Sequence, residues 1–191
     1  MKKIFPIVTI ILLTSCNNDN KVVVKDDSSG VTTITPTTQD FGKEYQDNVE
    51  KLQKLTPYTS EEMKALLPET LGGANRSNVS VTNLMGTSYA SADYEIDETT
   101  TVSLKIMDCA GEAGVGIYSL QFIAALNLQQ EDDDEITRTV DFNGEKAVEH
   151  IEKNGSEATL MWLAKGRLMA TLEGNGVTIE TIRDLAKSSG L

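Results

Sequence analysis

The sequence predicts an α+β fold, in which an antiparallel sheet with a C-terminal four-stranded meander is covered by helices. The first observation is three turns, Asn143-Gly144, Asn154-Gly155 and Lys165-Gly166, placed between segments of alternating apolar and polar residues. Asn-Gly is a strong hairpin signal because both central residues of the turn need positive φ. The second observation is that apolar residues in other segments recur every three or four positions, as in helices. Helices and antiparallel strands that occur in separate blocks are typical of α+β domains.

Two helices are predicted at the start of the domain. The first covers residues 41–55 and ends before Pro57. The second begins at Ser60, a favourable N-cap residue followed by two glutamates, and ends at Pro68. The first helix presents one apolar face, formed by Phe41, Tyr45, Val49, Leu52 and Leu55.

Strands follow between residues 76 and 109, where the apolar residues alternate with polar ones. One strand contains Val79 and Val81, a second covers residues 89–96, and a turn at residues 97–99 leads to a third. In that third strand Val102, Leu104 and Ile106 share one face. Residues 111–128 form the next predicted helix, whose broad apolar arc indicates burial against the sheet.

The meander is predicted from four segments, at residues 140–142, 147–151, 158–164 and 168–172. A closing helix over residues 178–186 places Ile179, Ile182 and Leu185 on one face. A single domain is therefore expected over residues 41–191. A domain of about 150 residues buries about 68–70% of its unfolded surface, so neither a disulfide nor a metal ion is needed for stability.

The N-terminus predicts export. Lys2 and Lys3 precede an apolar run from Ile4 to Leu13, half the length of about 20 residues needed to span a bilayer. A basic start followed by a short apolar run is typical of a signal peptide, here assigned to residues 1–15. Residues 16–40 are predominantly polar and are predicted to form a flexible tether.

The segment Leu13-Thr14-Ser15-Cys16 resembles the lipobox of bacterial lipoproteins. The resemblance implies that Cys16 receives a diacylglyceryl group, becomes the mature N-terminus and is then acylated. Asn17 stands where the sorting rule of enterobacterial lipoproteins favours the outer membrane. The polar residues after Cys16 resemble those of lipoproteins from the Bacteroidetes group. The expected location is therefore the cell envelope, with the membrane contacted through the lipid anchor.

A second resemblance involves the folded part. Leu66-Leu67-Pro68, Gly72-Gly73, Ile106-Met107-Asp108 and Gly174-Asn175-Gly176-Val177 are similar in layout to small uncharacterised bacterial lipoproteins. That layout resembles the Mog1/PsbP-like α/β/α sandwich. The resemblance implies a fold and no activity.

The chain has a formal net charge of -12, which argues against nucleic-acid binding. The densest acidic run is interpreted as a solvated, mobile loop and as a possible contact with a protein partner. It lacks the alternating spacing and the glycine of a Ca²⁺-binding loop, so no metal site is predicted. The run consists of Glu131, Asp132, Asp133, Asp134 and Glu135.

Candidate catalytic residues are few. The only histidine, His150, lies on a predicted strand and is interpreted as a surface residue. Cys109 is interpreted as a small buried residue. The glycine-rich segment from Gly111 to Gly116 lacks the lysine and hydroxyl residue of a P-loop and predicts close helix–sheet packing instead. No catalytic residue, cofactor or metal is therefore expected.

Three classes of function remain open. The first is a non-catalytic binding module on a lipid anchor, contacting a partner through a sheet edge or the loop 129–135. The second is a periplasmic inhibitor or immunity protein against a basic toxin or hydrolase, which the acidic charge would attract. The third is a metal-dependent or enzymatic carrier, which the absence of recognisable motifs disfavours.

Overall fold

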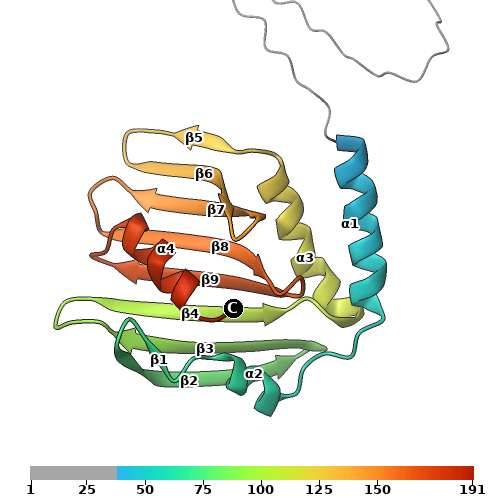
Figure 1. Ribbon diagram of the computed structural model, residues 1–191, viewed down its shortest axis with the longest axis horizontal. Coiled ribbons are helices and arrows are strands. Elements are labelled where there is room, and N and C mark those ends of the chain that lie inside the picture. Colours follow the sequence, from blue (N-terminus) through green and yellow to red (C-terminus); the bar gives the residue numbers. More distant parts are fainter. Residues whose placement is uncertain (1–37) are drawn as a thin grey trace, which may run out of the picture. The chain divides into compact units, whose positions relative to one another are not determined.

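The computed structural model describes residues 38–191, apart from the side chains at 38–41, 84, 122, 123 and 125 (Figure 1). The predicted signal peptide, Cys16 and nearly all of the predicted tether lie outside the described residues. The helices are α1 (Thr38–Gln53), α2 (Ser60–Leu66), α3 (Gly111–Ala125) and α4 (Ile179–Ser188). Among residues 38–191, no helix is both long and apolar enough to cross a membrane.

Every neighbouring pair of strands in the sheet is antiparallel, and the order is β1-β2-β3-β4-β9-β8-β7-β6-β5. The predicted α+β class is confirmed. Within the described part of the chain the strands are β1 (Thr70–Leu71), β2 (Ala74–Leu84), β3 (Thr87–Glu95), β4 (Thr101–Asp108), β5 (Gln129–Glu131), β6 (Glu135–Phe142), β7 (Glu145–Glu152), β8 (Glu157–Ala164) and β9 (Leu168–Asn175).

The chain builds this sheet from its two edges toward the middle. Strands β1 to β4 follow one another, and α3 then carries the chain to the opposite edge, where β5 begins. Strands β6 to β9 return stepwise until β9 pairs with β4, with Ile106 opposite Ala170. The four predicted C-terminal strands are therefore part of one nine-stranded sheet, because β4 and β9 join across a long sequence separation.

Two of the three predicted turns have left-handed backbone at both central residues, and at Asn154-Gly155 only the glycine has positive φ. Asn143 and Gly144 have φ of 52° and 85°, and Lys165 and Gly166 have φ of 53° and 63°. Two consecutive residues with positive φ give the type I′ geometry that matches the twist of paired strands. Gly155, between β7 and β8, has φ of 77°.

Alternation along the strands creates two apolar clusters on opposite faces of the sheet. One contains Leu104 and Ile106 of β4 together with residues of α2 and α4, including Met63 and Ile182. The other contains the next residue along β4, Met107, with residues of α1 and α3. Its buried members are Leu52, Cys109, Tyr118, Leu163 and Met169. In Figure 1, α4 lies across β8 and β9, whereas α1 and α3 stand beside the end of the sheet where β4 ends.

Some predicted boundaries were wrong. The N-cap of α2 is Thr59 rather than Ser60, because Thr59 and Glu62 form a reciprocal capping box. The helix predicted to reach residue 128 ends at Ala125. Strand β6 begins at Glu135, five residues before the predicted strand. Strand β5 was not predicted, because its three residues are polar and exposed and give no apolar alternation.

Candidate functional site

The acidic run contains the last residue of edge strand β5, Glu131, and the first residue of β6, Glu135, so the loop between the two strands is shorter than predicted. The three aspartates between them form a hydrogen-bonded turn. Glu131 pairs with Ile136 across the two strands. The carboxylate of Asp132 accepts hydrogen bonds from the backbone N–H groups of Asp134 and Glu135, both at 2.9 Å. We call Glu131, Asp132, Asp133, Asp134 and Glu135 the acidic edge.

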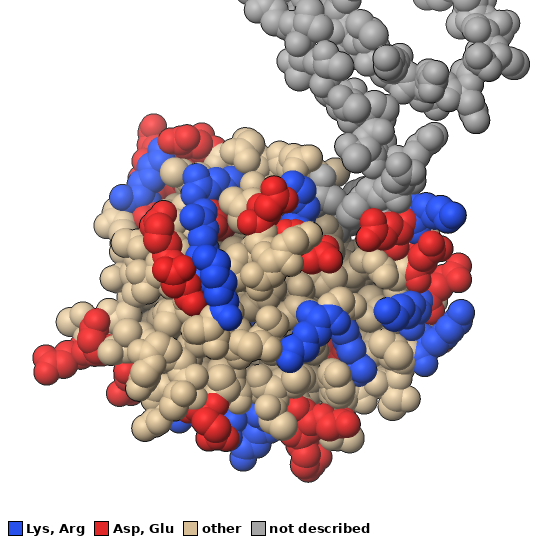
Figure 2. Space-filling model, in the orientation of Figure 1, with Lys and Arg blue, Asp and Glu red and all other residues tan. Residues whose placement is uncertain are grey.

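Lys153, in the turn after β7, is a lysine whose side chain contacts the acidic edge. Lys153 Nζ lies 2.8 Å from Glu131 Oε1 and donates to the backbone oxygen of Asp132 at 2.5 Å. Figure 2 shows acidic side chains, with basic ones beside them, at the corner where the β5–β6 turn lies in Figure 1. The hydrogen bonds from Glu135 and Asp134 lower the pKa of Asp132, so this carboxylate stays charged well into the acidic range.

The acidic edge borders a hollow of about 160 Å³ that is open to solvent. Its lining residues are Gln130, Glu131, Asp132 and Glu135. Pockets for small organic ligands have volumes of about 300–1,000 Å³. This hollow is therefore large enough for one side chain or a hydrated ion, and too small for a typical cofactor.

Glu135, the last residue of the acidic edge, lies close to Glu152 and to His150, the only histidine of the chain. Glu135 of β6 lies directly opposite Glu152 of β7. His150, two residues before Glu152, points to the same face of the sheet. His150 Nε2 is 3.6 Å from Glu135 Oε2 and 3.7 Å from Glu152 Oε1, and His150 Nδ1 is 3.0 Å from Thr137 Oγ1. All three side chains are partly exposed.

On the same face of the sheet, the strands beyond β7 carry further half-buried polar side chains. Ser103 Oγ donates to Asp93 Oδ1 at 2.5 Å, and Lys105 Nζ donates to Glu173 Oε1 at 2.5 Å. These groups satisfy one another. We therefore assign them to the stability of the sheet rather than to a site.

A second polar constellation, the anchor network of Tyr58, Asp108 and Arg167, lies where β4 ends. The fully buried carboxylate of Asp108 accepts from Arg167 Nε and one terminal nitrogen of Arg167, both at 2.8 Å. It also accepts from the backbone N–H groups of Tyr58 at 2.7 Å and Ala110 at 3.0 Å. The hydrogen bonds from its own guanidinium to Asp108 raise the pKa of Arg167.

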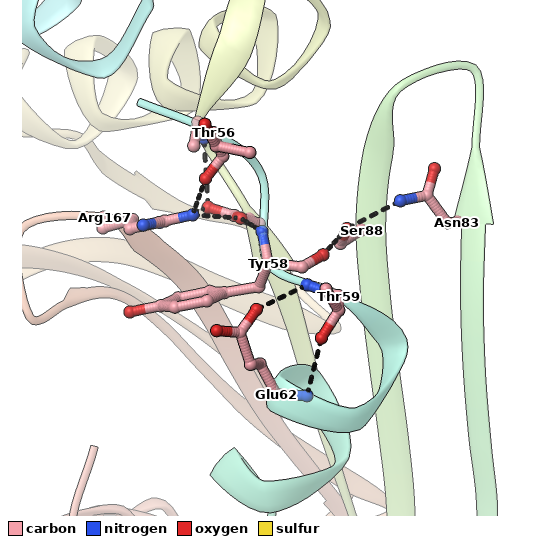
Figure 3. A network of polar contacts seen from close by, with 9 residues as sticks. Thr56, Tyr58, Thr59, Glu62, Asn83, Ser88 and Arg167 are labelled. Carbon is pink, nitrogen blue, oxygen red and sulfur yellow. Dashed lines mark hydrogen bonds and ion pairs between the residues drawn. The ribbon is translucent and has the colours of Figure 1, made fainter. Parts of the chain in front are cut away.

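Figure 3 shows how the anchor network ties the α1–α2 connection to the sheet. Arg167 donates to the backbone oxygen of Thr56 at 2.7 Å, and its guanidinium lies 3.6 Å from the centre of the Tyr58 ring. Ser88 donates to the backbone oxygen of Tyr58 at 2.6 Å, and Asn83 donates to Ser88. With four donors on one carboxylate, Asp108 has no capacity left for a ligand. The network is structural.

Glu149 of β7 is the other fully buried carboxylate with arginine partners. It accepts from Arg138 Nε at 2.9 Å and from a terminal nitrogen of Arg183 at 2.7 Å, and Arg183 Nε also contacts it. Arg183 belongs to α4, so this ion pair fixes that helix to the sheet. The hydrogen bonds to Glu149 raise the pKa of Arg183.

Cys109 is fully buried, as predicted, and burial raises the pKa of its thiol to about 12. A thiol that stays protonated is a poor nucleophile. The predicted close packing of the glycine-rich segment is confirmed at Gly114. A Cβ atom there would lie 2.6 Å from the backbone carbon of Cys109 and 2.7 Å from the backbone oxygen of Asp108.

Three of these residues were missed by sequence reasoning. Asp108 and Glu149 look like ordinary strand residues, and their arginines lie far away in the chain. Glu152 had a local signal, because residues two apart on a strand share a face, and His150 precedes it by two. Glu135 lies beside His150 and Glu152 because of the β6–β7 register, which the sequence does not show.

Comparison of the chain with known protein families and with curated protein sequences finds no match.

Proposed function

We propose that this chain is a lipid-anchored protein of the bacterial envelope whose folded domain is a non-catalytic binding module. The observation that favours this role is the acidic edge, where five consecutive acidic residues occupy the border of the sheet. Within residues 38–191, Lys153 is the lysine or arginine that pairs with this run. Most of the negative charge is therefore available to a partner.

The chemistry of the edge indicates a basic protein surface as the partner. Strand β5 is the last strand of the sheet and its three residues are exposed, so a partner segment can approach its backbone, the carboxylate of Glu131 and the aspartates of the following turn. The adjacent hollow of about 160 Å³ suits a lysine or arginine side chain. Attraction between opposite charges raises the association rate most strongly at low salt.

A non-catalytic role is further supported by Cys109, whose buried, protonated thiol is unsuited to nucleophilic chemistry. The finer description of the fold belongs to the same proposal. Apolar clusters with helices on both faces of the sheet support an α/β/α sandwich-like arrangement and the resemblance to the Mog1/PsbP-like layout.

The proposed lipid attachment at Cys16 is tested with the variant Cys16→Ser. We expect the wild-type protein to fractionate with membranes and to begin, after processing, at a modified Cys16. The variant is expected to lose the lipid and to stay unprocessed or to be released. A wild-type protein whose mass matches an unmodified chain beginning at residue 1 would contradict the proposal.

The contact surface is tested by site-specific photocrosslinking on intact cells. A crosslinker at Gln130, an exposed residue of β5 that borders the same hollow, is expected to capture a protein partner. The control is a crosslinker at Glu180, an exposed acidic residue on α4. Neutralising Glu131, Asp133 and Asp134 to their amides should abolish the capture at low salt, and equal capture from both positions would refute a specific edge contact.

A second candidate function is inhibition of a basic toxin or hydrolase, favoured by the same ordered run of carboxylates. The purified chain would then form a complex with a basic enzyme and reduce its activity. The variant with the three amides should lose the inhibition, and an unchanged inhibition would exclude the acidic edge as the inhibitory surface.

A further inference from the structure

We propose that Glu135, His150 and Glu152 form a binding site for a divalent transition-metal cation of the Zn²⁺ class. The three potential ligand atoms, one imidazole nitrogen and two carboxylate oxygens, all lie within 4.8 Å of one another. Glu135 also belongs to the acidic edge, but this inference goes beyond the proposed partner contact because it depends on coordination by three specific atoms rather than on total charge.

The set of ligand types fits such a cation. Imidazole nitrogen and carboxylate oxygen are both common zinc ligands, and a site with three protein ligands leaves a coordination position open. Hard cations such as Mg²⁺ and Ca²⁺ prefer oxygen-only sites, so the histidine selects against them. All three side chains are partly exposed, with side-chain exposures of 47% for Glu135 and 31% each for His150 and Glu152. A cation and its remaining water ligand can therefore enter from solvent.

The distances are close to those that coordination requires. With metal–ligand bonds of about 2.0–2.2 Å, the ligand atoms of a tetrahedral site are separated by about 3.4 Å. The observed separations from His150 Nε2 are 3.6 Å to Glu135 and 3.7 Å to Glu152. These two separations exceed the ideal value by a few tenths of an ångström, and the two carboxylate oxygens lie within 4.8 Å of each other. Rotation of the flexible glutamate side chains would close the remaining gap.

The histidine is already oriented for this role. Thr137 Oγ1 lies 3.0 Å from His150 Nδ1, which directs the other ring nitrogen, Nε2, to the two carboxylates. Metal-binding histidines commonly have such a partner on the second nitrogen, which fixes the tautomer and the ring orientation. Thr137 lies directly opposite His150 on the β6–β7 pair, so the sheet register itself supplies the contact.

The electrostatics of the cluster favour a cation. Glu135 and Glu152 lie directly opposite each other, and like charges in that position destabilise a sheet. The nearby Lys153 contacts Glu131 and the backbone oxygen of Asp132 instead. A bound divalent cation would therefore supply positive charge between the two carboxylates.

The experiment uses the ring signals of His150 in NMR spectra of the full chain without a histidine tag. Because the chain contains one histidine, these signals need no assignment by mutation. Addition of Zn²⁺ is expected to shift them with saturation at one equivalent, and a chelator should reverse the shift. Mg²⁺ at the same concentration should leave them unchanged.

Variants then distinguish coordination of Zn²⁺ by the three side chains from general attraction of the cation to acidic residues. His150→Ala and Glu152→Gln are each expected to raise the Kd for Zn²⁺ at least about tenfold. The matched control is Asp133→Asn, which removes one negative charge from the same corner without touching the three ligands. Its Kd should change less than about twofold.

Thermal unfolding gives an independent readout. At Zn²⁺ concentrations about a hundredfold above the Kd, the Tm should rise by about 5–10 °C, and His150→Ala should lose this shift. The buried Trp162, the only tryptophan, reports unfolding by fluorescence. The proposal is refuted if Zn²⁺ leaves the His150 signals unchanged, or if Asp133→Asn weakens binding as much as Glu152→Gln does.

Discussion

The anchor network at the end of β4 and the acidic edge at β5 both depend on carboxylates, but their surroundings differ. Asp108 is fully buried and accepts four hydrogen bonds from Arg167 and two backbone N–H groups. The acidic edge lies at the border of the sheet, where Asp132 and Lys153 organise the turn and most of the other carboxylates face water.

The contribution of a charged side chain to stability depends on its burial. A buried carboxylate loses its hydration, so its partners must replace that hydration, and removing one partner leaves an uncompensated charge. An exposed carboxylate keeps its water, and its pairs contribute little to stability. Such a charge stays free to attract a partner. Substitutions at the two regions should therefore differ in their effect on the free energy of unfolding.

The largest effect is expected for Asp108→Ala. The substitution leaves the guanidinium of Arg167 and the N–H groups of Tyr58 and Ala110 without their acceptor, so the free energy of unfolding should fall by about 3–5 kcal/mol. Urea unfolding followed by the fluorescence of Trp162 measures this loss. Asp133→Ala at the acidic edge is the matched control and should change the free energy by less than about 0.5 kcal/mol. Equal losses would remove the contrast between the two regions.

The next effect concerns packing beside the anchor network. Gly114→Ala should destabilise the protein by about 1–3 kcal/mol, because its Cβ would overlap the backbone of Asp108 and Cys109. Gly116→Ala, two residues along the same helix, meets no atom within 4 Å and should stabilise the protein by about 0.5–1 kcal/mol. Chemical denaturation of both variants measures the difference. Two variants of equal stability would show that α3 does not pack closely against the end of β4.

A smaller effect is expected when the acidic edge is neutralised. Changing Glu131 to Gln and both Asp133 and Asp134 to Asn should alter the free energy of unfolding by at most about 0.5 kcal/mol, with a small gain at low salt from reduced repulsion. Unfolding curves at low and high ionic strength measure this. A loss of several kcal/mol would show that the acidic edge supports the fold as the anchor network does.

The smallest effect is the titration of Asp132. Its pKa is lowered in the folded protein by hydrogen bonds from Glu135 and Asp134, so the folded state favours the charged form. The resulting stability is present above the unfolded pKa of about 3.9 and is lost as pH falls through the lower folded pKa. NMR titration of the carboxyl carbon should show a pKa below 3.9 in the folded protein. A value at or above 3.9 would contradict the hydrogen-bonded turn.

Local patterns were sufficient for much of the fold. Val102, Leu104 and Ile106 alternate with polar residues and form β4, and Asn143-Gly144 forms a turn with both residues at positive φ. These features depend on neighbouring residues alone, so the sequence shows them. Strand β5 was missed because its exposed residues have no apolar pattern, and it exists through backbone pairing with β6.

The candidate sites also combine features that the sequence shows with features that depend on strand pairing. The acidic run and the only histidine are visible in the sequence as separate features, and each was interpreted as a solvated surface element. Their proximity depends on the register that sets Glu135 opposite Glu152 and Thr137 opposite His150. A shift of that register by one residue would move these side chains to opposite faces.

Local periodicity and residue type are sufficient to predict the α+β class, the hairpin turns, the burial of Cys109 and the position of the acidic run. The three-dimensional fold alone shows that β4 joins β9, that Arg167 neutralises Asp108, and that Glu135, His150 and Glu152 meet. Strand pairing and ion pairing between distant segments depend on geometry in space. No pattern along the chain encodes the distance between two carboxylates on neighbouring strands.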